Sequence, residues 1–408
     1  MGIISRLFSR KAAVPMNSAD LHTFLRFGGQ SKSGVYVNAA TALECSTVLA
    51  CARVIANGIS QVSFKLYQSS GRKRLPATDH WLFDLVDTAP NEFQTSFEFR
   101  QEIALHMVLT GNAYVWLNRV GGRIVEMLPY PPGCVTVHRA DDHSVSYSIR
   151  LQDGSQVSLS AKDVWHLRWL SWDGVVGLDS VCLAREAIGL SLSTEEHGAK
   201  LFSNGACPGG LLSTETVLTP EQRKDLKAAW QAAHGGGENA FKTAVLYGGM
   251  KFTAMGSPND QAQFLETRRH QVEEVCRAFG VLPIMVGHYD KASTYASAEQ
   301  MFLQHAVHTL SPWYECIEKS AKLHLLSKEE WRKGYYFKFN ANSLMRGAAR
   351  DRAEFYTKLY GVGALCPNDI RELEDMDPYE GGDEYRVPLN MEEPGHEPEA
   401  TEGKDGKA

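Results

Sequence analysis

The chain of 408 residues has no long hydrophobic run. A helix that crosses a bilayer needs about 20 consecutive apolar residues, and the candidates here, such as 280–287, are far shorter. Residues 1–12 are basic and amphipathic but lack the continuous apolar stretch of a signal peptide. Arg6 occupies the position at which a myristoylation motif has Ser or Thr. A membrane-spanning protein is therefore excluded, and a reducing cytoplasm is the expected compartment.

Cysteine pairs with a recognisable spacing are absent as well. The eight cysteines are scattered, without a C-x-x-C pair and without a Cys/His spacing suited to zinc. Most of them have apolar neighbours in the sequence, where a free cysteine behaves as a small hydrophobic residue. The cysteines therefore indicate neither a disulfide-stabilised secreted domain nor a metal site.

The charges do not form a polybasic nucleic-acid-binding domain. The net charge is −6, but residues 369–408 carry 14 acidic and 4 basic side chains, which leaves a balance of +4 for the rest of the chain. Such a weakly positive body can face DNA locally without binding it tightly. The acidic end has almost no aromatic residues after Tyr385, and we expect residues 377–408 to form a solvated, disordered tail.

The signatures of common enzymes are missing too. The sequence has no G-x-S-x-G elbow, no G-x-x-x-x-G-K-[ST] loop, no H-E-x-x-H motif and no G-x-G-x-x-G after a strand. His166, between Trp165 and Trp169 on an alternating segment, is predicted to be a packed core histidine. His305 and His308 are one helical turn apart, but no third ligand has a suitable spacing. We therefore predict no catalytic, cofactor-binding or metal-binding residue, and a protein that is not an enzyme.

What the sequence does contain is a change of pattern near Trp172. Before this residue, short alternating segments mix with helical patterns, which predicts an α+β fold. After it the helical patterns are long; residues 219–222 form a capping box, and Pro312 is expected to kink the longest helix. The predicted helices are 41–59, 96–109, 179–204, 219–234, 257–279, 295–326, 347–360 and 368–374. The predicted strands are 62–68, 113–119, 124–128, 135–138, 144–150, 157–160, 209–213 and 335–340, and a strand pair broken at 248–249 is predicted over 243–253.

Short motifs between residues 201 and 347 follow one another in a specific order. In the helix predicted over 257–279, Leu265 and Val275 are expected on the apolar face, and Glu266 and Arg268 on the opposite, charged face. The motifs are 201–206, 248–252, 257–268, 272–274, 279–283, Gly287, 294–295, 299–300, 309–313 and 344–347. With this series the chain resembles the HK97-type portal protein family of tailed bacteriophages and prophages over roughly residues 35–380.

The block 263–268 is the most specific part of the resemblance. The loop 282–285 departs from a commoner Pro-Pro version, so the resemblance does not fix its local shape. The positions that match the family's motifs are Gln263, Phe264, Leu265, Glu266, Arg268, Pro283, Gly287 and Pro312.

The resemblance implies a ring, usually of about twelve subunits, at one vertex of the capsid. DNA is pumped in through the channel by the terminase and later leaves by the same route. The implied partners are further copies of the chain, the large terminase subunit, a head–tail adaptor, the major capsid protein and double-stranded DNA read without sequence specificity. The implied location is the virion, with assembly in the host cytoplasm, and no cofactor is implied because a separate motor hydrolyses ATP.

The resemblance also implies a portal fold, with an α/β wing, long stem helices, a small β-α-β clip, a kinked channel helix and a helical crown. The implied assignment is a flexible N-terminal segment 1–34, wing 35–178, stem helix 179–205, clip 206–256, stem helix 257–280, tunnel loop 281–294, kinked helix and return strand of the wing 295–343, crown 344–376 and acidic tail 377–408.

Within the implied tunnel loop, Pro283 and Gly287 break the helical pattern before a short polar stretch. We hypothesise that this stretch, His288, Tyr289, Asp290 and Lys291, faces the DNA channel. Lys291 is then the side chain most able to touch a phosphate, in a weak, salt-screened contact. An ordinary connection between two helices is the competing interpretation.

Two other classes of protein remain open from the sequence. One is a hydrolase whose site has no known motif, for instance a capsid-maturation protease. The other is a different structural head protein, such as a capsid subunit, for which more strand and fewer long helices are expected. The molar mass of the purified protein separates the enzyme from the portal, because only the portal forms a ring of many hundred kilodaltons.

Overall fold

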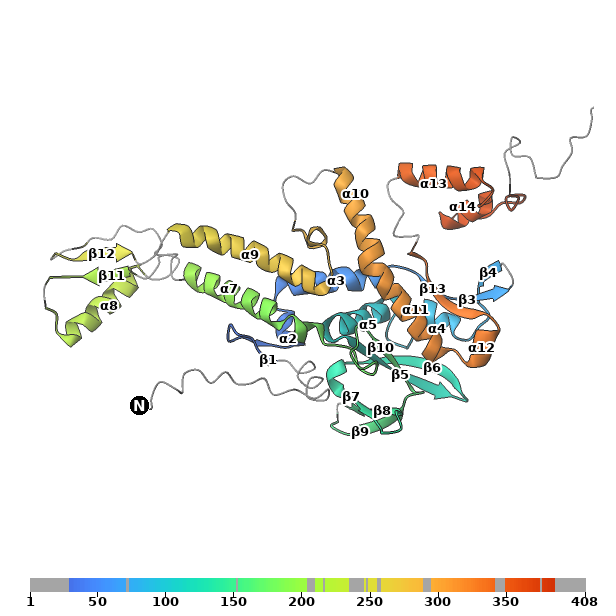
Figure 1. Ribbon diagram of the computed structural model, residues 1–408, viewed down its shortest axis with the longest axis horizontal. Coiled ribbons are helices and arrows are strands. Elements are labelled where there is room, and N and C mark those ends of the chain that lie inside the picture. Colours follow the sequence, from blue (N-terminus) through green and yellow to red (C-terminus); the bar gives the residue numbers. More distant parts are fainter. Residues whose placement is uncertain are drawn as a thin grey trace, which may run out of the picture. The chain divides into compact units, whose positions relative to one another are not determined.

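Figure 1 shows a computed structural model of the protein, coloured along the chain. The chain divides into two compact units, residues 1–340 and 341–408. The structure describes residues 29–70, 73–151, 153–203, 210–215, 217–234, 246, 249–254, 258–288, 295–341, 349–374 and 376–385.

Two helices in contact, one of which packs on an antiparallel sheet, form the centre of the first unit. Helix α3 (Ser46–Ser60) packs against α5 (Ser96–Thr110), which also contacts strand β5. The sheet order is β10-β5-β6, with β5 at Asn112–Val120, β6 at Arg123–Tyr130 and β10 at Val164–Arg168. Thr95 and Glu98 cap the start of α5 reciprocally, as a capping box does. The predicted helix 96–109 and strands 113–119 and 124–128 are confirmed.

A second sheet pairs strands that are far apart in the sequence of the first unit. Strand β3 (Phe64–Ser70) pairs with β4 (Lys73–Pro76) on one side and with β13 (Tyr335–Phe339) on the other, both antiparallel. The ring of Phe64 lies 5.5 Å from that of Phe337 and 4.4 Å from that of Phe339. Burial of these rings fixes the register, because a shift by one residue would turn them to the other face.

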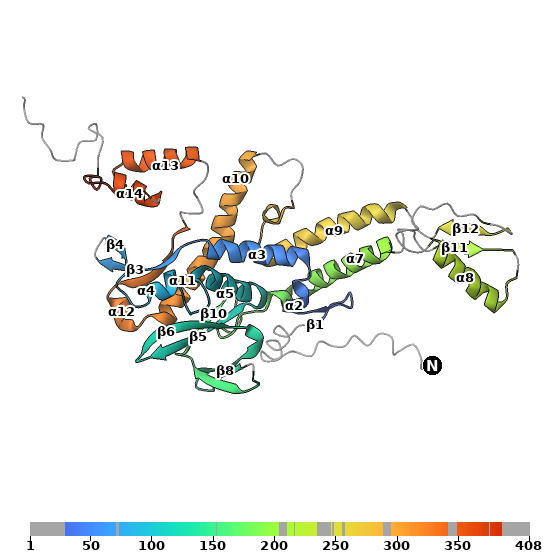
Figure 2. The ribbon, with the colours of Figure 1, turned by 180° about the vertical axis from the view of Figure 1, so that it is seen from behind.

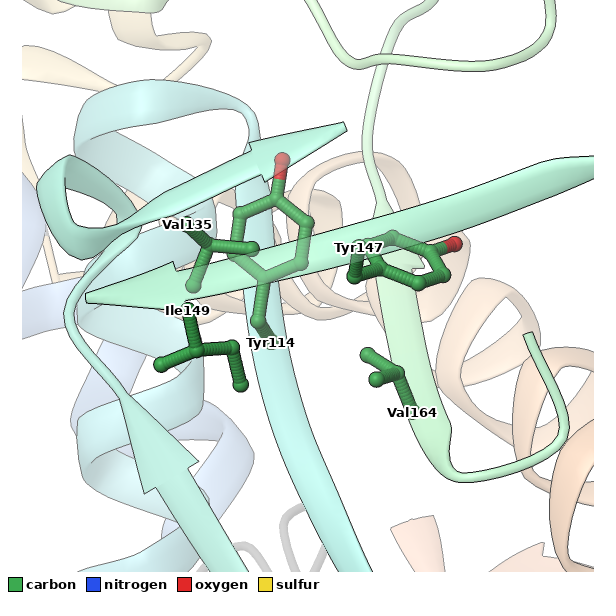
Figure 3. Close-up of a cluster of buried hydrophobic side chains, with 5 residues drawn as sticks. All are labelled: Tyr114, Val135, Tyr147, Ile149 and Val164. Atoms are coloured by element: carbon green, nitrogen blue, oxygen red, sulfur yellow. The ribbon is translucent and has the colours of Figure 1, made fainter. Parts of the chain in front are cut away.

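A third sheet, β7-β8-β9, packs on the first through a small apolar cluster. Its strands are β7 (Val135–Arg139), β8 (Val145–Arg150) and β9 (Gln156–Ser160). Figure 3 shows the cluster, in which Tyr147 of β8 approaches Tyr114 of β5, with the ring centroids 6.1 Å apart. The five buried members of the cluster are Tyr114, Val135, Tyr147, Ile149 and Val164.

A buried polar chain runs beside this cluster. The Tyr147 hydroxyl lies 3.2 Å from Nδ1 of His166, whose Nε2 lies 3.0 Å from Oδ1 of Asn112. The same Oδ1 accepts a hydrogen bond of 2.7 Å from the Gly177 amide, so Nε2 of His166 is the donor and Nδ1 accepts from Tyr147. The prediction of a packed core histidine is therefore confirmed, and His166 is not free to act as a base.

The remaining part of the first unit consists mainly of helices and one strand pair. In Figures 1 and 2, which show opposite sides, α7 and α9 lie next to each other, and their residues are in contact. None of the helices in the described part of the chain combines the length and the apolar character that a bilayer-spanning segment requires. The elements are α6 (Ser180–Leu183), α7 (Arg185–Ser203), β11 (Gly210–Ser213), α8 (Pro220–His234), β12 (Lys251–Ala254), α9 (Pro258–Phe279), the 3₁₀ turn η3 (Pro283–Val286), α10 (Tyr295–Gln304), the π-helical turn η4 (His305–Leu310), α11 (Ser311–Leu325) and α12 (Lys328–Arg332).

Three long helices that the sequence predicts are divided in the structure. The pattern over 41–59 is split because Asn38 caps a single turn, α2 (Ala39–Ala42), before α3 begins. The pattern over 179–204 is interrupted at Ala184, whose ψ of 5° leaves the helical range. The pattern over 295–326 contains the π-helical turn η4. Periodicity detects the apolar face in each case but not a local break in the backbone hydrogen bonds.

Several short elements were not predicted, and some predictions fall outside the described residues. Of the strand pair predicted over 243–253, only the second strand is described, as β12, because most of 241–248 lies outside the described residues. The unpredicted elements are β1 (Gly29–Gln30), β2 (Tyr36–Val37), β4, α4 (Phe83–Asp87), the 3₁₀ turn η1 (Pro132–Cys134), β10 and α12.

The second unit contains α13 (Ala349–Gly361) and α14 (Pro367–Leu373), close to the predicted helices 347–360 and 368–374. Residues 377–385, expected to belong to the disordered tail, fold back on α14. The Asn368 side-chain amide donates to the Tyr379 carbonyl at 3.0 Å and to the Asp383 carboxylate at 2.9 Å. The rest of the predicted tail, 386–408, lies outside the described residues.

Candidate functional site

The segment expected to face a DNA channel begins as an ordered turn after α9. Pro283 stands at the start of η3, where its missing N–H leaves no hydrogen bond unmade. Gly287 ends the turn with a φ of 80°, a conformation that glycine adopts without steric cost. The two residues therefore interrupt the helix as predicted. Of the four hypothesised channel residues, Tyr289, Asp290 and Lys291 lie outside the described residues.

His288 is described, and it lies next to α9. Its Nε2 is 3.6 Å from Oε1 of Glu273, and its amide donates to the Pro283 carbonyl at 3.0 Å. Both side chains are partly exposed, so the contact stabilises this arrangement by no more than about 1 kcal/mol. The pair still orients the chain where it leaves η3. No local pattern in the sequence indicates this contact, because the turn η3 separates the two residues.

The described side chains of the motif block on α9 are exposed. The Leu265 side chain is 62% exposed, whereas Val275, predicted on the same apolar face, is fully buried. Helix α3 packs against the C-terminal part of α9, where Cys51 contacts Cys276, about three helical turns beyond Leu265. Glu266 and Arg268 are exposed, as predicted, whereas the side chains of Gln263 and Phe264 lie outside the described part.

Pro312 follows a π-helical turn rather than a simple kink. It occupies the first turn of α11, directly after η4, and its side chain is exposed. Proline cannot donate a hydrogen bond to a carbonyl in the preceding turn, so it favours a local change in the helical pattern there. The expected irregularity is therefore present, in the form of the wider hydrogen-bonding ring of a π turn.

The π turn buries His305 against the rest of the first unit. The His305 side chain is buried, and its Nδ1 has no hydrogen-bond partner among the described residues. Burial lowers the pKa of His305, which keeps the imidazole neutral. On the same turn, the Thr309 hydroxyl donates to the Gly280 carbonyl at 2.9 Å and ties η4 to the end of α9. Among the described residues, no cluster of metal-binding side chains includes His305 or His308.

Helix α10 and the π turn carry large apolar side chains on their surface. Leu303 and Val307 are 50% and 49% exposed, and Phe302 is 42% exposed. Leu303 and Val307 are four positions apart, so they lie on one face of the helical segment. Adjacent exposed apolar side chains of this size are typical of a surface that another protein covers. No motif or pattern in the sequence distinguishes these three residues from other apolar positions of the helix.

Asp179 caps the short helix that leads into α7. Its carboxylate accepts the Cys182 amide hydrogen at 2.8 Å, and burial raises its pKa from 3.8 to about 6. A carboxyl whose pKa is higher in the folded state binds protons more tightly there than in the unfolded chain. Its contribution to stability is therefore greatest below about pH 4 and is lost as the pH rises through about 6.

Asp179→Asn keeps the capping oxygen and removes the charge. We expect the variant to be more stable than the unchanged protein at pH 8, by about 2 kcal/mol, and equally stable below about pH 4. Urea unfolding at several pH values measures the difference. Asp153→Asn is the control, because hydrogen bonds from Ser155 lower the pKa of this exposed carboxyl. Equal unfolding free energies for Asp179→Asn and the unchanged protein at pH 8 would contradict the expectation.

A cavity of about 350 Å³ lies between the β5–β6 turn and the junction of α11 and α12. Arg119 closes one side by donating to the carbonyls of Lys162 at 3.3 Å and His324 at 3.5 Å. The Ser327 hydroxyl accepts from the Glu330 amide, and the His324 ring donates to the Ser320 carbonyl. The serine therefore caps α12, the histidine bonds a carbonyl of its own helix α11, and we assign the cavity no catalytic role.

Comparison with known proteins places the chain among phage proteins. The sequence model of the family described as "Phage portal protein" matches residues 46–375. The "Probable portal protein" of Streptomyces phage phiC31 is 31% identical over an alignment of 421 residues. The alignment covers 98% of this chain and 91% of that protein. The "Portal protein" of Enterobacteria phage HK97 is 28% identical over 354 residues, which cover 85% of this chain and 82% of that protein.

A solved structure shares the fold. A chain in the neck of an empty gene transfer agent particle, computed with C6 symmetry, superposes with a TM-score of 0.58 at 21% identity. The match covers 83% of this chain and 93% of that chain. At this level of identity the likeness concerns the fold, which confirms the predicted mixture of helices and strands in a portal-like arrangement.

Proposed function

The chain belongs to the phage portal protein family, and from this premise we propose that about twelve copies of it form the ring-shaped DNA channel at one vertex of a phage capsid. The terminase packages double-stranded DNA through this channel, and the DNA leaves by the same route at ejection. The observation that carries the proposal is the family match over residues 46–375, which runs from α3 to α14.

The segments of the chain are proposed to form the same parts as in other portals. The helices α7 and α9 form the stem, and β11, α8 and β12 form the clip, which meets the terminase and later the head–tail adaptor. Two contacts support a separate clip: β11 pairs with β12, and the Trp230 ring of α8 stacks on Phe252 at 5.5 Å. Residues 35–178 and the return strand β13, which make up the three-sheet region, are proposed to form the wing, and residues 344–376 the crown. Contacts with the major capsid protein are proposed for the outer part of the ring.

Neighbouring subunits are proposed to meet at α10 and the π turn. Half-exposed Leu303 and Val307 support this, because burying them between copies removes apolar surface from water. A single chain leaves this surface open, whereas a closed ring covers it in every subunit without leaving a free end.

No catalytic step is assigned to the chain. A portal guides DNA, and ATP hydrolysis in the separate terminase motor supplies the energy, so a nucleophile is not required. The channel wall has to avoid tight phosphate binding, because strong contacts would arrest the moving DNA. Charges on α9 support such a wall, since the basic Arg268 and Arg277 flank the acidic Glu273 and Glu274. The protein is proposed to act in the virion after assembly in the host cytoplasm.

The tunnel loop is proposed to touch the passing DNA through Lys291. The ordered turn η3 and the His288–Glu273 pair support a loop held firmly at its first end. Lys291→Glu is therefore expected to lower packaging efficiency several-fold at low salt while rings still form. An electrostatic defect shrinks as ionic strength rises, because salt screens exposed charges over about 10 Å at 0.1 M.

A packaging assay with purified proheads at several salt concentrations measures the effect of Lys291→Glu. The matched control is Lys328→Glu, which changes the same charge on the exposed start of α12, away from the loop. Normal packaging by Lys291→Glu at low salt would remove Lys291 from the channel. Loss of the ring itself in this variant would show that the loop has a structural role instead.

A further inference from the structure

Two buried thiols from distant parts of the chain meet between α3 and α9. Sγ of Cys51 lies 3.8 Å from Sγ of Cys276, although 225 positions separate the two residues. Both residues are 0% exposed. Cys51 belongs to a helix in the centre of the fold, and Cys276 lies near the end of α9. The contact therefore joins the three-sheet region to the helix that carries the family's motif block.

We propose that Cys51 and Cys276 form an oxidative modification site, at which a peroxide converts the two thiols into an intramolecular disulfide that fastens α9 to α3. A disulfide needs a sulfur–sulfur distance of about 2.0 Å, so the two sulfurs have to approach by less than 2 Å. The packing of α3 on α9 already holds both side chains at this distance, and a change in side-chain torsion supplies the remaining approach.

The other described cysteines have different neighbours. The Cys45 thiol lies 3.5 Å from the Ser191 hydroxyl, and the Cys316 thiol donates to the Arg168 carbonyl at 3.1 Å. Cys366 receives a hydrogen bond from the Asp369 amide in the second unit. Among the described residues, Cys51 and Cys276 are thus the two cysteines whose sulfurs lie within 3.8 Å of each other, which makes the cross-link selective for them.

The hydrogen bond between the two sulfurs assigns their roles. The Cys51 thiol donates to the sulfur of Cys276, which raises the pKa of Cys51 and lowers the pKa of Cys276. Cys276 therefore supplies the thiolate, which is the reactive form of cysteine. It attacks hydrogen peroxide, breaks the O–O bond and becomes a sulfenic acid as water is released.

The second step closes the cross-link. The sulfur of Cys51 attacks the sulfenic sulfur of Cys276, the S–S bond forms, and the sulfenic oxygen leaves as a second water with the thiol proton. In sum, two thiols lose two electrons and two protons, and one peroxide becomes two waters. Hydrogen peroxide is small enough to reach a buried site during local opening, whereas a bulky disulfide such as oxidised glutathione is hindered there.

The disulfide is expected to form after assembly, in the released particle. A reducing cytoplasm keeps both thiols free, whereas a released particle is exposed to oxidants and has no thiol pool to reduce it. In the proposed portal, on which this consequence rests, the disulfide fastens each stem helix to its wing. Closing so long a loop also restricts the unfolded chain, and we expect the melting temperature of the isolated protein to rise by about 5 °C.

The test treats the full-length protein with hydrogen peroxide under native conditions, blocks free thiols with N-ethylmaleimide in denaturant, and maps the joined peptides by mass spectrometry. We expect one linked pair of peptides, containing Cys51 and Cys276, together with the higher melting temperature, both reversed by dithiothreitol. Cys276→Ala and Cys51→Ala should lose the linked pair, whereas Cys316→Ala should keep it.

Three results would overturn the proposal: both thiols remaining free, oxidation of Cys276 that stops at the sulfinic acid, or a cross-link that joins other cysteines. Peptide mapping of the unchanged protein decides between these outcomes even if an alanine variant fails to fold. The result is also independent of ring formation. A cross-link in a protein that stays monomeric would support the modification site and contradict the proposed portal function.

Discussion

Gly177→Ala is expected to prevent the chain from folding, or to destabilise it by more than about 4 kcal/mol. A Cβ atom at Gly177 would lie 2.0 Å from the Gly111 carbonyl oxygen and 2.7 Å from its carbon, far inside van der Waals contact. The Gly177 backbone cannot move away easily, because the Asn112 side chain forms hydrogen bonds with both its amide and its carbonyl, at 2.7 and 3.0 Å. The Gly111 carbonyl is itself held by the Trp169 amide at 2.9 Å.

The yield of soluble protein and its thermal unfolding measure the effect of this substitution. Gly133→Ala is the matched control, because an added Cβ there has no neighbour within 4 Å. We expect the control to change the free energy of unfolding by less than about 0.5 kcal/mol. A Gly177→Ala protein that unfolds at the same temperature as the control would show that the loop before α6 does not approach β5 as closely as described.

The double substitution Leu303→Asp and Val307→Asp is expected to abolish ring formation and leave a folded monomer. Both side chains are about half exposed in the single chain, so the charges are tolerated there. In the proposed interface, the same carboxylates would be buried without a partner, at a cost of several kcal/mol each. This cost recurs at every subunit contact of a closed ring, which makes the effect large.

Light scattering and circular dichroism together test this expectation, since the first reports the assembly and the second the fold of the monomer. Leu75→Asp, on the edge strand β4, is the control; its side chain is 60% exposed, and the proposed interface does not include it. Rings that persist with both aspartates would exclude α10 and the π turn from the subunit contact. A variant that loses its helical signal would show instead that these residues support the monomer.

Local patterns predicted the elements whose ends carry their own signals. The helix α8 begins where residues 219–222 form a capping box, with the Thr219 amide 3.0 Å from the Gln222 side chain. The strand 335–340 has the aromatic composition of a buried strand and is present as β13. Its pairing with β3, however, depends on a register between residues about 270 positions apart, and no local pattern encodes such a register.

The candidate site was predictable in outline, because Pro283, Gly287 and Pro312 break helices wherever they occur. Each of them coincides with an interruption: η3 begins at Pro283 and ends before Gly287, and η4 precedes Pro312. The exposure of Leu265 could not be predicted, since periodicity gives the apolar side of a helix but not how far its packing partner extends. The Cys51–Cys276 contact was invisible for the same reason as the β3–β13 pairing.

The central claim, that the chain assembles into a portal ring, is tested most directly by the molar mass and symmetry of the purified protein. Size-exclusion chromatography with light scattering, followed by electron microscopy, gives both quantities. Twelve chains of 45.2 kDa predict a particle of about 540 kDa with a central channel and one copy of the chain per symmetry unit. A stable monomer or dimer without a channel, especially one that hydrolyses peptide or ester substrates, would contradict the claim.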